Sequence, residues 1–262
     1  MEEMVSTLLT VKGAVIAVWL LLFFVAERLR PAAVDPTLAD GRWNRAVRNL
    51  ALFLLNGGVS FAVVVPVTAW AATHALDWRP SAWPAGVGGL LIDLLLLDFF
   101  IYWWHRLNHV LPVLWRFHQV HHMDRFLDST SAVRFHFGEV ILSALVRGAF
   151  VFAMGIPLSS VLMFEVLVLL SSIFQHSNIR LPVALDRALS TVIVTPGWHW
   201  MHHHALRADT DSNYANTLTV WDRLFASRSP NDRDLLMEIG IERVKSDAGF
   251  LELLGKPFIR KS

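Results

Sequence analysis

The chain has 262 residues, of which 54% are hydrophobic and only 17% are charged. Soluble domains carry about 25% charged residues, so this composition predicts a membrane protein. The net charge of +1 gives no nucleic-acid footprint and implies no polyanionic partner. The absence of cysteine excludes disulfides, iron–sulfur clusters, thiolate-ligated haem and zinc–cysteine sites. The length suits a single domain, 1–262.

Four apolar regions are long enough for helices that cross a membrane, which need about 20 apolar residues. We expect such helices at 8–26, 50–72 and 86–104. The fourth region, 140–174, is interrupted at 155–157 by Gly-Ile-Pro, which predicts a helical hairpin because glycine ends helices well and proline begins them well. The first arm is short, so two alternatives remain open: the hairpin spans the membrane, or it dips in and returns.

The arginines of the loops predict the orientation. The loop between the first two expected helices contains Arg28, Arg30, Arg42, Arg45 and Arg48. The loop between the second and third contains only Arg79. Short loops rich in Lys and Arg stay in the cytoplasm, so we expect the N-terminus and the loop at 77–83 to lie outside.

The expected fold is therefore all-α: about four membrane helices, as two spans or three plus a hairpin, under a helical cytoplasmic cap. We expect a membrane anchor at 8–104, a histidine-rich cap from 105–139 and 176–227, the hairpin at 140–175 and a tail at 228–262. Apolar residues of the tail recur at helical spacing.

Eleven of the 12 histidines lie between residues 105 and 204, on the face predicted to be cytoplasmic. They form one H-x-x-x-H and two H-x-x-H-H groups: His105 and His109; His118, His121 and His122; His199, His202 and His203. His204 follows the last group, and His136 and His176 flank the hairpin. A lone histidine such as His74 is ordinarily a core or surface residue, but three groups on one face predict a metal site.

The spacing has a physical reason, since residues i, i+3 and i+4 of a helix share one face. Eight to ten histidines are too many for one ion, so we expect two metals. The chain contains neither H-E-x-x-H, typical of zinc proteases, nor the Glu-x-x-His of soluble di-iron bundles. Imidazole suits iron among other metals. An all-imidazole iron pair at a membrane surface favours O2-dependent oxidation of an aliphatic C–H bond.

The chain resembles the fatty acid hydroxylase superfamily, often labelled sterol desaturase. The resemblance rests on DFFIYWWHRLNH at 98–109, FHQVHHMD at 117–124, RFHFGE at 134–139, FQHSN at 174–178, HWMHHH at 199–204, NY at 213–214 and WDRLF at 221–225. It departs at Ala215 and Ala226, where glycine is common, and at Phe137, where proline is common.

The resemblance implies a four-helix anchor under a cytoplasmic cap and a di-iron site between them. It implies these ligands: His105, His109, His118, His121, His122, His199, His202 and His203. His136 and His176 match positions that the family also tends to use, so we include both.

Other polar residues are candidates to support the ligands or the chemistry. Ligating histidines usually donate their second N–H to a carboxylate or a carbonyl. We favour Asp98 and Asp222, together with Tyr102, one of only two tyrosines. Asp98 lies about 10 Å below His105 along the helix, so it should contact another segment. The remaining candidate carboxylates are Asp124, Asp128, Glu139, Asp209 and Asp211.

The predicted function is hydroxylation of a lipid such as a fatty acyl chain or sterol, with two iron ions and O2. Two alternatives stay open: a lipid desaturase on the same site, or a membrane metal-binding protein that is not an oxygenase. The sequence has no dinucleotide-binding fingerprint, so a separate ferredoxin or cytochrome is expected to supply electrons.

One further expectation concerns Arg147 and Glu165, which interrupt the apolar hairpin. Each lies nine residues from Ile156, so antiparallel arms would place the two at similar depth. An isolated charge in a membrane costs about 2.5–3.5 kcal/mol even on lenient scales. We therefore predict an ion pair that fixes the register of the hairpin.

Overall fold

The structure, a computed structural model, describes residues 2–35, 42–79, 83–244 and 248–259, without the side chains of 2–11 and 42–43. Within these ranges it is helical, and its β-structure is limited to three isolated bridges. The long helices are α1 (Glu2–Leu29), α2 (Arg42–Val59), the π-helical turn η2 (Ser60–Val64), α3 (Val65–Thr73), α4 (Val87–Val110), α6 (Phe137–Met154) and α7 (Leu158–His176). The shorter elements are α5 (Pro112–His122), η3 (Ser131–Val133), α8 (Val183–Leu189), α9 (Pro196–His202), α10 (Arg207–Thr210), α11 (Val220–Leu224), α12 (Phe250–Gly255) and η4 (Lys256–Phe258).

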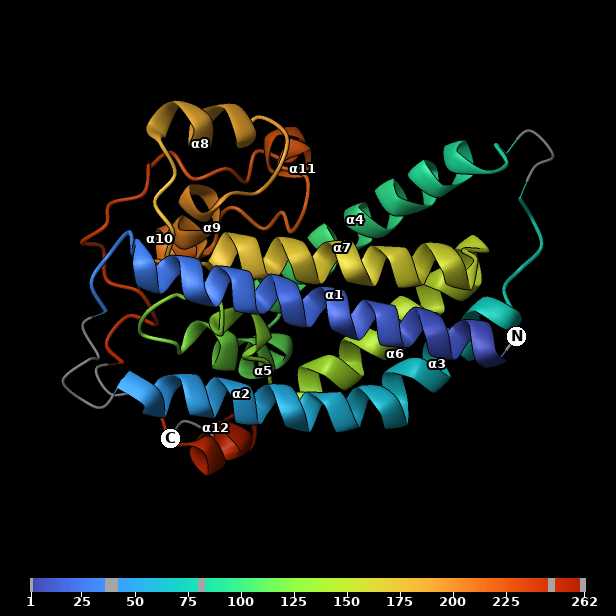
Figure 1. Ribbon diagram of the computed structural model, residues 1–262, viewed down its shortest axis with the longest axis horizontal. Coiled ribbons are helices and arrows are strands. Elements are labelled where there is room, and N and C mark those ends of the chain that lie inside the picture. The colour runs from blue at the N-terminus through green and yellow to red at the C-terminus, as the bar shows by residue number, and fades with distance from the viewer. Residues whose placement is uncertain (1, 36–41, 80–82, 245–247, 260–262) are drawn as a thin grey trace.

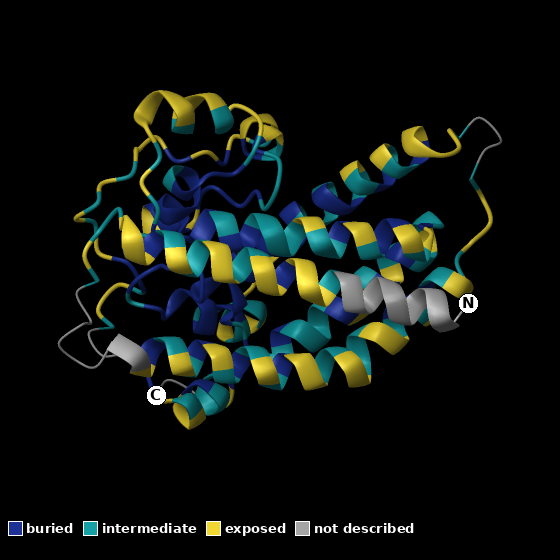
Figure 2. Ribbon diagram, in the orientation of Figure 1, coloured by how far each residue is buried: buried dark blue, intermediate teal, exposed yellow. Residues whose placement is uncertain are grey.

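Four helical stretches are long and apolar enough to cross a membrane: Asn44–Thr73, α4, α6 and α7. They coincide with the second and third expected helices and with both arms of the hairpin, which confirms the predicted fold class. Helix α1 covers the first expected helix, 8–26. Figure 2 shows exposed and intermediate residues along the described parts of the long helices, whereas buried residues gather around α5 and α9. Exposed apolar side chains on these helices, such as Leu54 and Phe61, suit contact with lipid.

Helices α2 and α3 form one continuous span that is interrupted by η2, directly before Pro66. Proline has no backbone N–H, and its ring crowds the carbonyl one turn earlier. A single wide turn accommodates this defect without ending the helix.

The hairpin closes as its residues predict. Gly155 ends α6 in the left-handed conformation, at φ +67°, which glycine adopts without steric strain. Pro157 precedes the first turn of α7. Each arm has 18 or 19 residues. Eighteen residues rise about 27 Å, close to the thickness of the hydrocarbon core, so the arms fit a full span better than a shallow dip.

The predicted ion pair within the hairpin is confirmed. Arg147 Nη2 donates to Glu165 Oε1 at 2.8 Å, so the two arms are fixed at matching depth. The structure adds a third member: Lys12 of α1 donates to Glu165 Oε2.

The two ends of the bundle differ in content. The histidine-bearing ends of α4 and α7 meet α5 and α9 at the left of Figure 1, and the beginning of α1 lies at the opposite end. At that opposite end the segment after α3 joins the hairpin turn: Leu76 N–H donates to Phe152 O at 2.9 Å, and Arg79 Nε to Met154 O at 3.1 Å. The described residues after α3 and the hairpin turn thus lie at one end of the bundle and the histidines at the other, as the predicted succession of membrane helices requires. Residues 80–82 of the loop at 77–83 lie outside the described residues.

The tail is helical only in part. Its apolar residues at 235–262 recur at helical spacing, but in the described part of 228–262 only α12 and η4 are helical. The described chain before α12 is irregular, with turns and one isolated bridge, and Ala205 N–H donates to Glu238 O at 2.8 Å and Gly240 N–H to His203 O at 3.1 Å. The apolar side chains pack separately: Ile239 contacts Trp200, whereas Leu253 contacts the core around α2 and α5.

Candidate di-metal centre

Nine of the ten predicted ligand histidines form two adjacent clusters. In each cluster the nearest ring nitrogens all lie within 4.8 Å of one another. The five-histidine cluster consists of His105, His109, His118, His122 and His202. The four-histidine cluster consists of His121, His176, His199 and His203. All nine side chains are at least nine-tenths buried, which is rare for so many polar groups unless each has a partner.

Each H-x-x-H-H group is divided between the clusters. From α5, His118 and His122 enter the five-histidine cluster and His121 enters the four-histidine cluster. From α9 and its C-cap residue the division is reversed: His199 and His203 enter the four-histidine cluster and His202 the other. On a helix i and i+4 are separated by about 40°, whereas i+3 lies about 60° to the other side. The same spacing on two facing helices therefore produces two centres that share both helices.

Six of the nine Nδ1 atoms point outward to fixed acceptors. His105 Nδ1 lies 2.8 Å from Tyr214 O, and His202 Nδ1 lies 2.7 Å from Ser212 O. His118 Nδ1 lies 2.8 Å from Glu139 Oε1, and His109 Nδ1 lies 3.4 Å from Asp211 Oδ1. In the four-histidine cluster, His121 Nδ1 lies 3.2 Å from Arg134 O and His176 Nδ1 lies 2.7 Å from Ser172 O. A carbonyl or carboxylate accepts only, so each of these rings carries its proton on Nδ1 and presents a bare Nε2.

The Nε2 atoms converge without donors between them. His176 Nε2 lies 3.1 Å from the Nε2 atoms of both His121 and His199, and His203 Nε2 lies 3.2 Å from that of His199. The Nε2 atoms of His109, His118 and His202 are buried with no hydrogen-bond partner. Converging lone pairs repel one another unless a cation lies among them. The donor set therefore fits metal ions that prefer imidazole.

The neutral state of the clustered histidines also supports a metal site. Burial and the neighbouring histidines lower the pKa of His121, His122, His199 and His203 well below the ordinary value. Burial lowers the pKa of His202 to about 3. The rings are therefore neutral at physiological pH, as ligation requires.

A cavity of about 340 Å³ extends from the clusters into the membrane part. Its inner end is lined by ligand histidines, among them His105 and His176, and by Glu139 and Asn216. Many of its wall residues are apolar and come from α4, α6 and α7, namely Ile101, Trp104, Val140, Ala144, Val168 and Leu169, and α1, η2 and α3 also contribute. A lipid chain in this cavity would contact the histidines directly.

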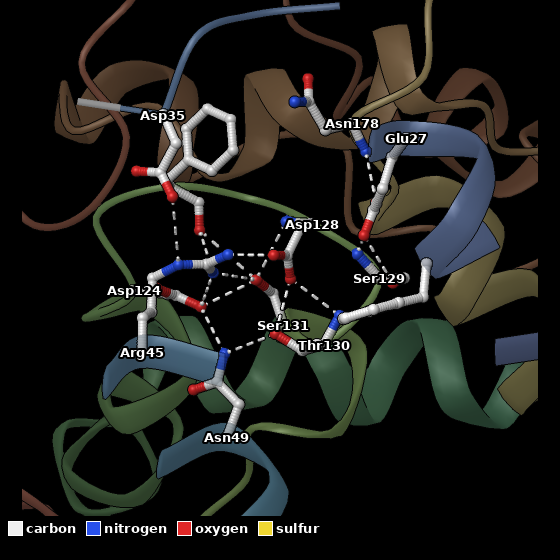
Figure 3. Close-up of polar contacts among 12 residues, drawn as sticks. Glu27, Asp35, Arg45, Asn49, Asp124, Asp128, Ser129, Thr130, Ser131 and Asn178 are labelled. Carbon is white, nitrogen blue, oxygen red and sulfur yellow. Dashed lines mark hydrogen bonds and ion pairs between the residues drawn. The ribbon is translucent and has the colours of Figure 1, made fainter. Parts of the chain in front are cut away.

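A buried polar network, which no motif of the sequence predicts, holds the chain between α5 and α6. Arg45 Nη1 donates to Asp124 Oδ2 and Phe126 O, both at 3.0 Å, and Arg45 Nη2 pairs with Asp128 (Figure 3). Asn49 Nδ2 donates to Asp124 Oδ2 at 3.0 Å. Burial alone would raise the pKa of Asp124, but Arg45 and Arg134 lower it below the ordinary value.

This network has two consequences. Arg134 Nη1 donates to Asn49 Oδ1 at 3.0 Å, which fixes the residue whose carbonyl faces His121. In addition, Glu27 at the end of α1 accepts from Ser129 N–H at 2.9 Å. Helices α1 and α2 therefore both contact the loop between α5 and α6. Arg45 was interpreted as a loop charge that sets orientation, yet its guanidinium is internal and paired.

The three residues favoured for support or chemistry contact the 213–227 segment rather than the imidazoles. Asp98 Oδ2 accepts from Trp221 Nε1 at 2.8 Å and from Leu218 N–H at 3.2 Å, so it contacts another segment, as expected. Tyr102 Oη lies 2.8 Å from Ser227 Oγ. Asp222 accepts from the backbone N–H groups of Tyr214, at 2.8 Å, and Ala215, at 3.1 Å. Asp222 thereby shapes the loop whose Tyr214 carbonyl holds His105, and burial raises its pKa.

His136 is not part of either cluster, which corrects its assignment as a ligand. Its Nδ1 accepts from Gly138 N–H at 2.9 Å, and its Nε2 lies 3.1 Å from Leu254 O. Both ring nitrogens therefore have other partners, and the side chain acts as the N-cap of α6. His204 also lies apart, with its Nδ1 2.8 Å from Asp209 Oδ2. His74 is exposed, as expected of a lone histidine.

Comparison with known proteins agrees with this geometry. The model of the fatty acid hydroxylase family matches residues 90–227, slightly more than half of the chain. The chain therefore belongs to the fatty acid hydroxylase family, which confirms the resemblance. No solved structure shows significant similarity to it.

Three relatives illustrate the range of the family. The chain is 30% identical to the ornithine lipid hydroxylase of Rhizobium tropici over 206 residues, which is 78% of this chain and 60% of the relative. It is 30% identical to the alkylglycerol monooxygenase of Xenopus tropicalis over 55% of this chain and 31% of the relative. It is 29% identical to the cholesterol 25-hydroxylase of Rattus norvegicus over 63% of this chain and 55% of the relative. The matched part thus spans at most 60% of the length of these relatives.

Proposed function

We propose that the protein is an O2-dependent di-iron hydroxylase that acts on a C–H bond of a membrane lipid. The observation that carries the proposal is the double histidine cluster at the end of an apolar cavity between membrane helices. The names of all three relatives describe oxidation of a lipid, and this supports the substrate class.

The clustered histidines would hold one iron ion in each cluster, through their Nε2 atoms. Iron ions bound there would supply the electrons and the Lewis acidity that activate O2 toward an aliphatic C–H bond. Because all of the ligating imidazoles would be neutral, they would not compensate the positive charge of the iron ions, which suits an oxidising centre.

The side chains around the centre would orient the substrate and the ligands. The apolar walls exclude water from the lipid chain and aim it at the histidines. Glu139 accepts a hydrogen bond from His118 Nδ1 with Oε1, while its buried Oε2 has no hydrogen-bond partner beside the cavity. Asp98, Tyr102 and Asp222 would act as positioning residues, because they hold the 213–227 segment that supplies Tyr214 O and Asn216.

Two electrons per turnover would come from a separate ferredoxin or cytochrome on the cytoplasmic side.

The proposed orientation, with the histidine clusters on the cytoplasmic side, can be tested with an impermeant thiol reagent in intact cells. Asp77 is exposed at the end remote from the histidines, and Asp232 is exposed near them. Cysteine at Asp77 should be labelled and cysteine at Asp232 should not; the reverse would overturn the orientation.

The activity is tested by lipid profiling of cells with and without the protein, paired with metal analysis of the purified chain. Hydroxylation predicts a lipid that gains one oxygen atom and a chain that holds two iron ions. Loss of two hydrogens without gain of oxygen would instead indicate a desaturase. Unchanged lipids with tightly bound zinc from iron-replete cells would favour the metal-binding alternative.

A further inference from the structure

The end of the cavity remote from the histidines is charged. Lys12, Arg147 and Glu165 all line it, and they come from α1, α6 and α7. Glu165 accepts from Arg147 with one oxygen and from Lys12 with the other. We call these three residues the charged triad. Its members are largely but not fully buried, with 14–23% of each side chain exposed, so lipid in the bilayer can reach it.

The charged triad has more positive charge and more donors than its own contacts use. Two cations face one carboxylate, so the net charge is +1. Both carboxylate oxygens are occupied, whereas the Nε of Arg147 is buried without a hydrogen-bond partner. Lys has three donors and Arg has five, of which the contacts within the charged triad use one each. A buried donor without an acceptor is unfavourable, and an anionic oxygen would remove that deficit.

We propose that the charged triad is the subsite that anchors a carboxylate at the end of the lipid substrate. The proposal rests on the proposed function, and it adds the substrate class and the point of attack. Glu165 precedes His176 by 11 residues on α7, a rise of about 16 Å. A substrate anchored by its carboxylate would therefore be oxidised at a carbon far along its chain. The volume of about 340 Å³ is near the lower end for ligand pockets, which suits a single-chain lipid.

Glu165 gives the proposal an unusual test, because its removal should strengthen binding. Glu165→Gln leaves Lys12 and Arg147 without their carboxylate, so both cations become available to the ligand. Arg147→Met removes a cation and leaves Glu165 paired with Lys12. Arg30→Met is the matched control, because Arg30 is an exposed cation near the other end of α1 and does not line the cavity.

The experiment measures equilibrium binding of radiolabelled hexadecanoate and of its methyl ester to the purified full-length protein in uncharged detergent. Glu165→Gln should tighten binding of hexadecanoate and Arg147→Met should weaken it, each by about tenfold, as expected for one hydrogen bond between charged groups. Binding of the ester should stay within about twofold, and Arg30→Met should change neither ligand. Equal changes for acid and ester would overturn the proposal and leave the charged triad a helix-packing contact. If Arg147→Met does not fold, the sign of the Glu165→Gln effect decides alone.

Binding needs no turnover, so it separates this proposal from the proposed function. Carboxylate-selective binding without lipid oxidation would support the subsite and refute the hydroxylase. Lipid oxidation without carboxylate-selective binding would do the opposite. In the active protein, the series from tetradecanoate to octadecanoate gives a second readout. The subsite predicts oxidation at a constant number of carbons from the carboxyl group; a constant number from the methyl end would contradict it.

Discussion

The five-histidine and four-histidine clusters share helices α5 and α9, yet the outer edges of their imidazoles contact different groups. In the five-histidine cluster, two Nδ1 atoms face the carboxylates of Glu139 and Asp211, two face backbone carbonyls, and that of His122 has no hydrogen-bond partner. In the four-histidine cluster, the two paired Nδ1 atoms face backbone carbonyls only. The Nδ1 atoms of His199 and His203 are buried without a hydrogen-bond partner.

This difference indicates two unequal metal sites. A carboxylate behind an imidazole raises its basicity and fixes its orientation, which strengthens the bond to the metal. The five-histidine cluster also has one ligand more than a four-coordinate ion needs. We therefore expect it to hold its ion more firmly, and the four-histidine cluster to lose its ion first.

Removal of one ligand from the four-histidine cluster should give the largest effect, and the same change in the five-histidine cluster is its comparison. His203→Ala leaves three histidines in the smaller cluster, so the chain should lose one iron ion and activity should fall roughly 100-fold or more, beyond the 10–100-fold of an outer partner. His109→Ala leaves four histidines and should keep both ions with a smaller loss of activity. Metal analysis and turnover of both variants check this. Equal losses of metal would contradict the inequality of the sites.

Acid should destabilise the metal-free protein more strongly than an ordinary membrane bundle. The pKa of His202 is lowered from 6.5 to about 3, so the unfolded chain binds its proton first as pH falls. The stability from a neutral His202 is therefore complete above about pH 6.5 and is lost as pH falls toward about 3. The pKa values of the buried neighbours His122 and His203 are also lowered, so these residues make the stability depend more steeply on pH.

Thermal unfolding of the metal-free chain across this pH window measures the effect. His74→Gln is the control: His74 is exposed and lies outside both clusters, so its replacement should leave the pH profile unchanged. A melting temperature that stays constant between about pH 6.5 and about 4 would show that the imidazoles are not buried in the neutral state.

Much of this comparison could be anticipated from the sequence, but not all of it. Histidine spacing predicts shared helix faces, and the Gly-Ile-Pro interruption predicts the hairpin with its Arg147–Glu165 pair. The division between clusters follows from the angles of i+3 and i+4, yet it also requires two helices to face each other. That is a tertiary fact which spacing alone does not contain.

The supporting contacts were harder to predict for a similar reason. Seven carboxylates were candidates, and which of them reaches an imidazole depends on how loops fold back. Glu139 contacts His118 because α6 begins beside α5, whereas Asp124 and Asp128 pair with Arg45 instead. Arg45 lies in a segment that looks like a charged loop. Arg45 and Asn49 are four residues apart, the spacing of neighbours on one face of a helix, and this was the signal that the two side chains could act together.

The role of Glu139 can be separated from that of Asp211 by two matched substitutions. Glu139→Gln keeps an acceptor for His118 Nδ1 but removes the charge from a buried contact, so iron affinity should fall about tenfold, the lower end of such effects. Asp211→Asn removes the charge from a longer and more exposed contact, and affinity should change by about twofold or less. Competition with a chromogenic chelator measures both. A larger effect from Asp211→Asn would reverse our ranking of the two carboxylates.

His136 should give the smallest effect on the metals, and it tests the boundary of the two clusters. As the N-cap of α6, its side chain accepts from Gly138 N–H, and alanine cannot do so. His136→Ala should therefore lower the free energy of unfolding by about 0.5–2 kcal/mol, whereas His136→Asn should restore most of it because asparagine is a good N-cap. Both variants should retain the iron content of the unmodified chain, since neither ring nitrogen of His136 faces the clusters. Chemical unfolding and metal analysis of the same preparations check both points together. If iron is lost from both variants while stability is unchanged, His136 is a ligand and the four-histidine cluster is incomplete as described.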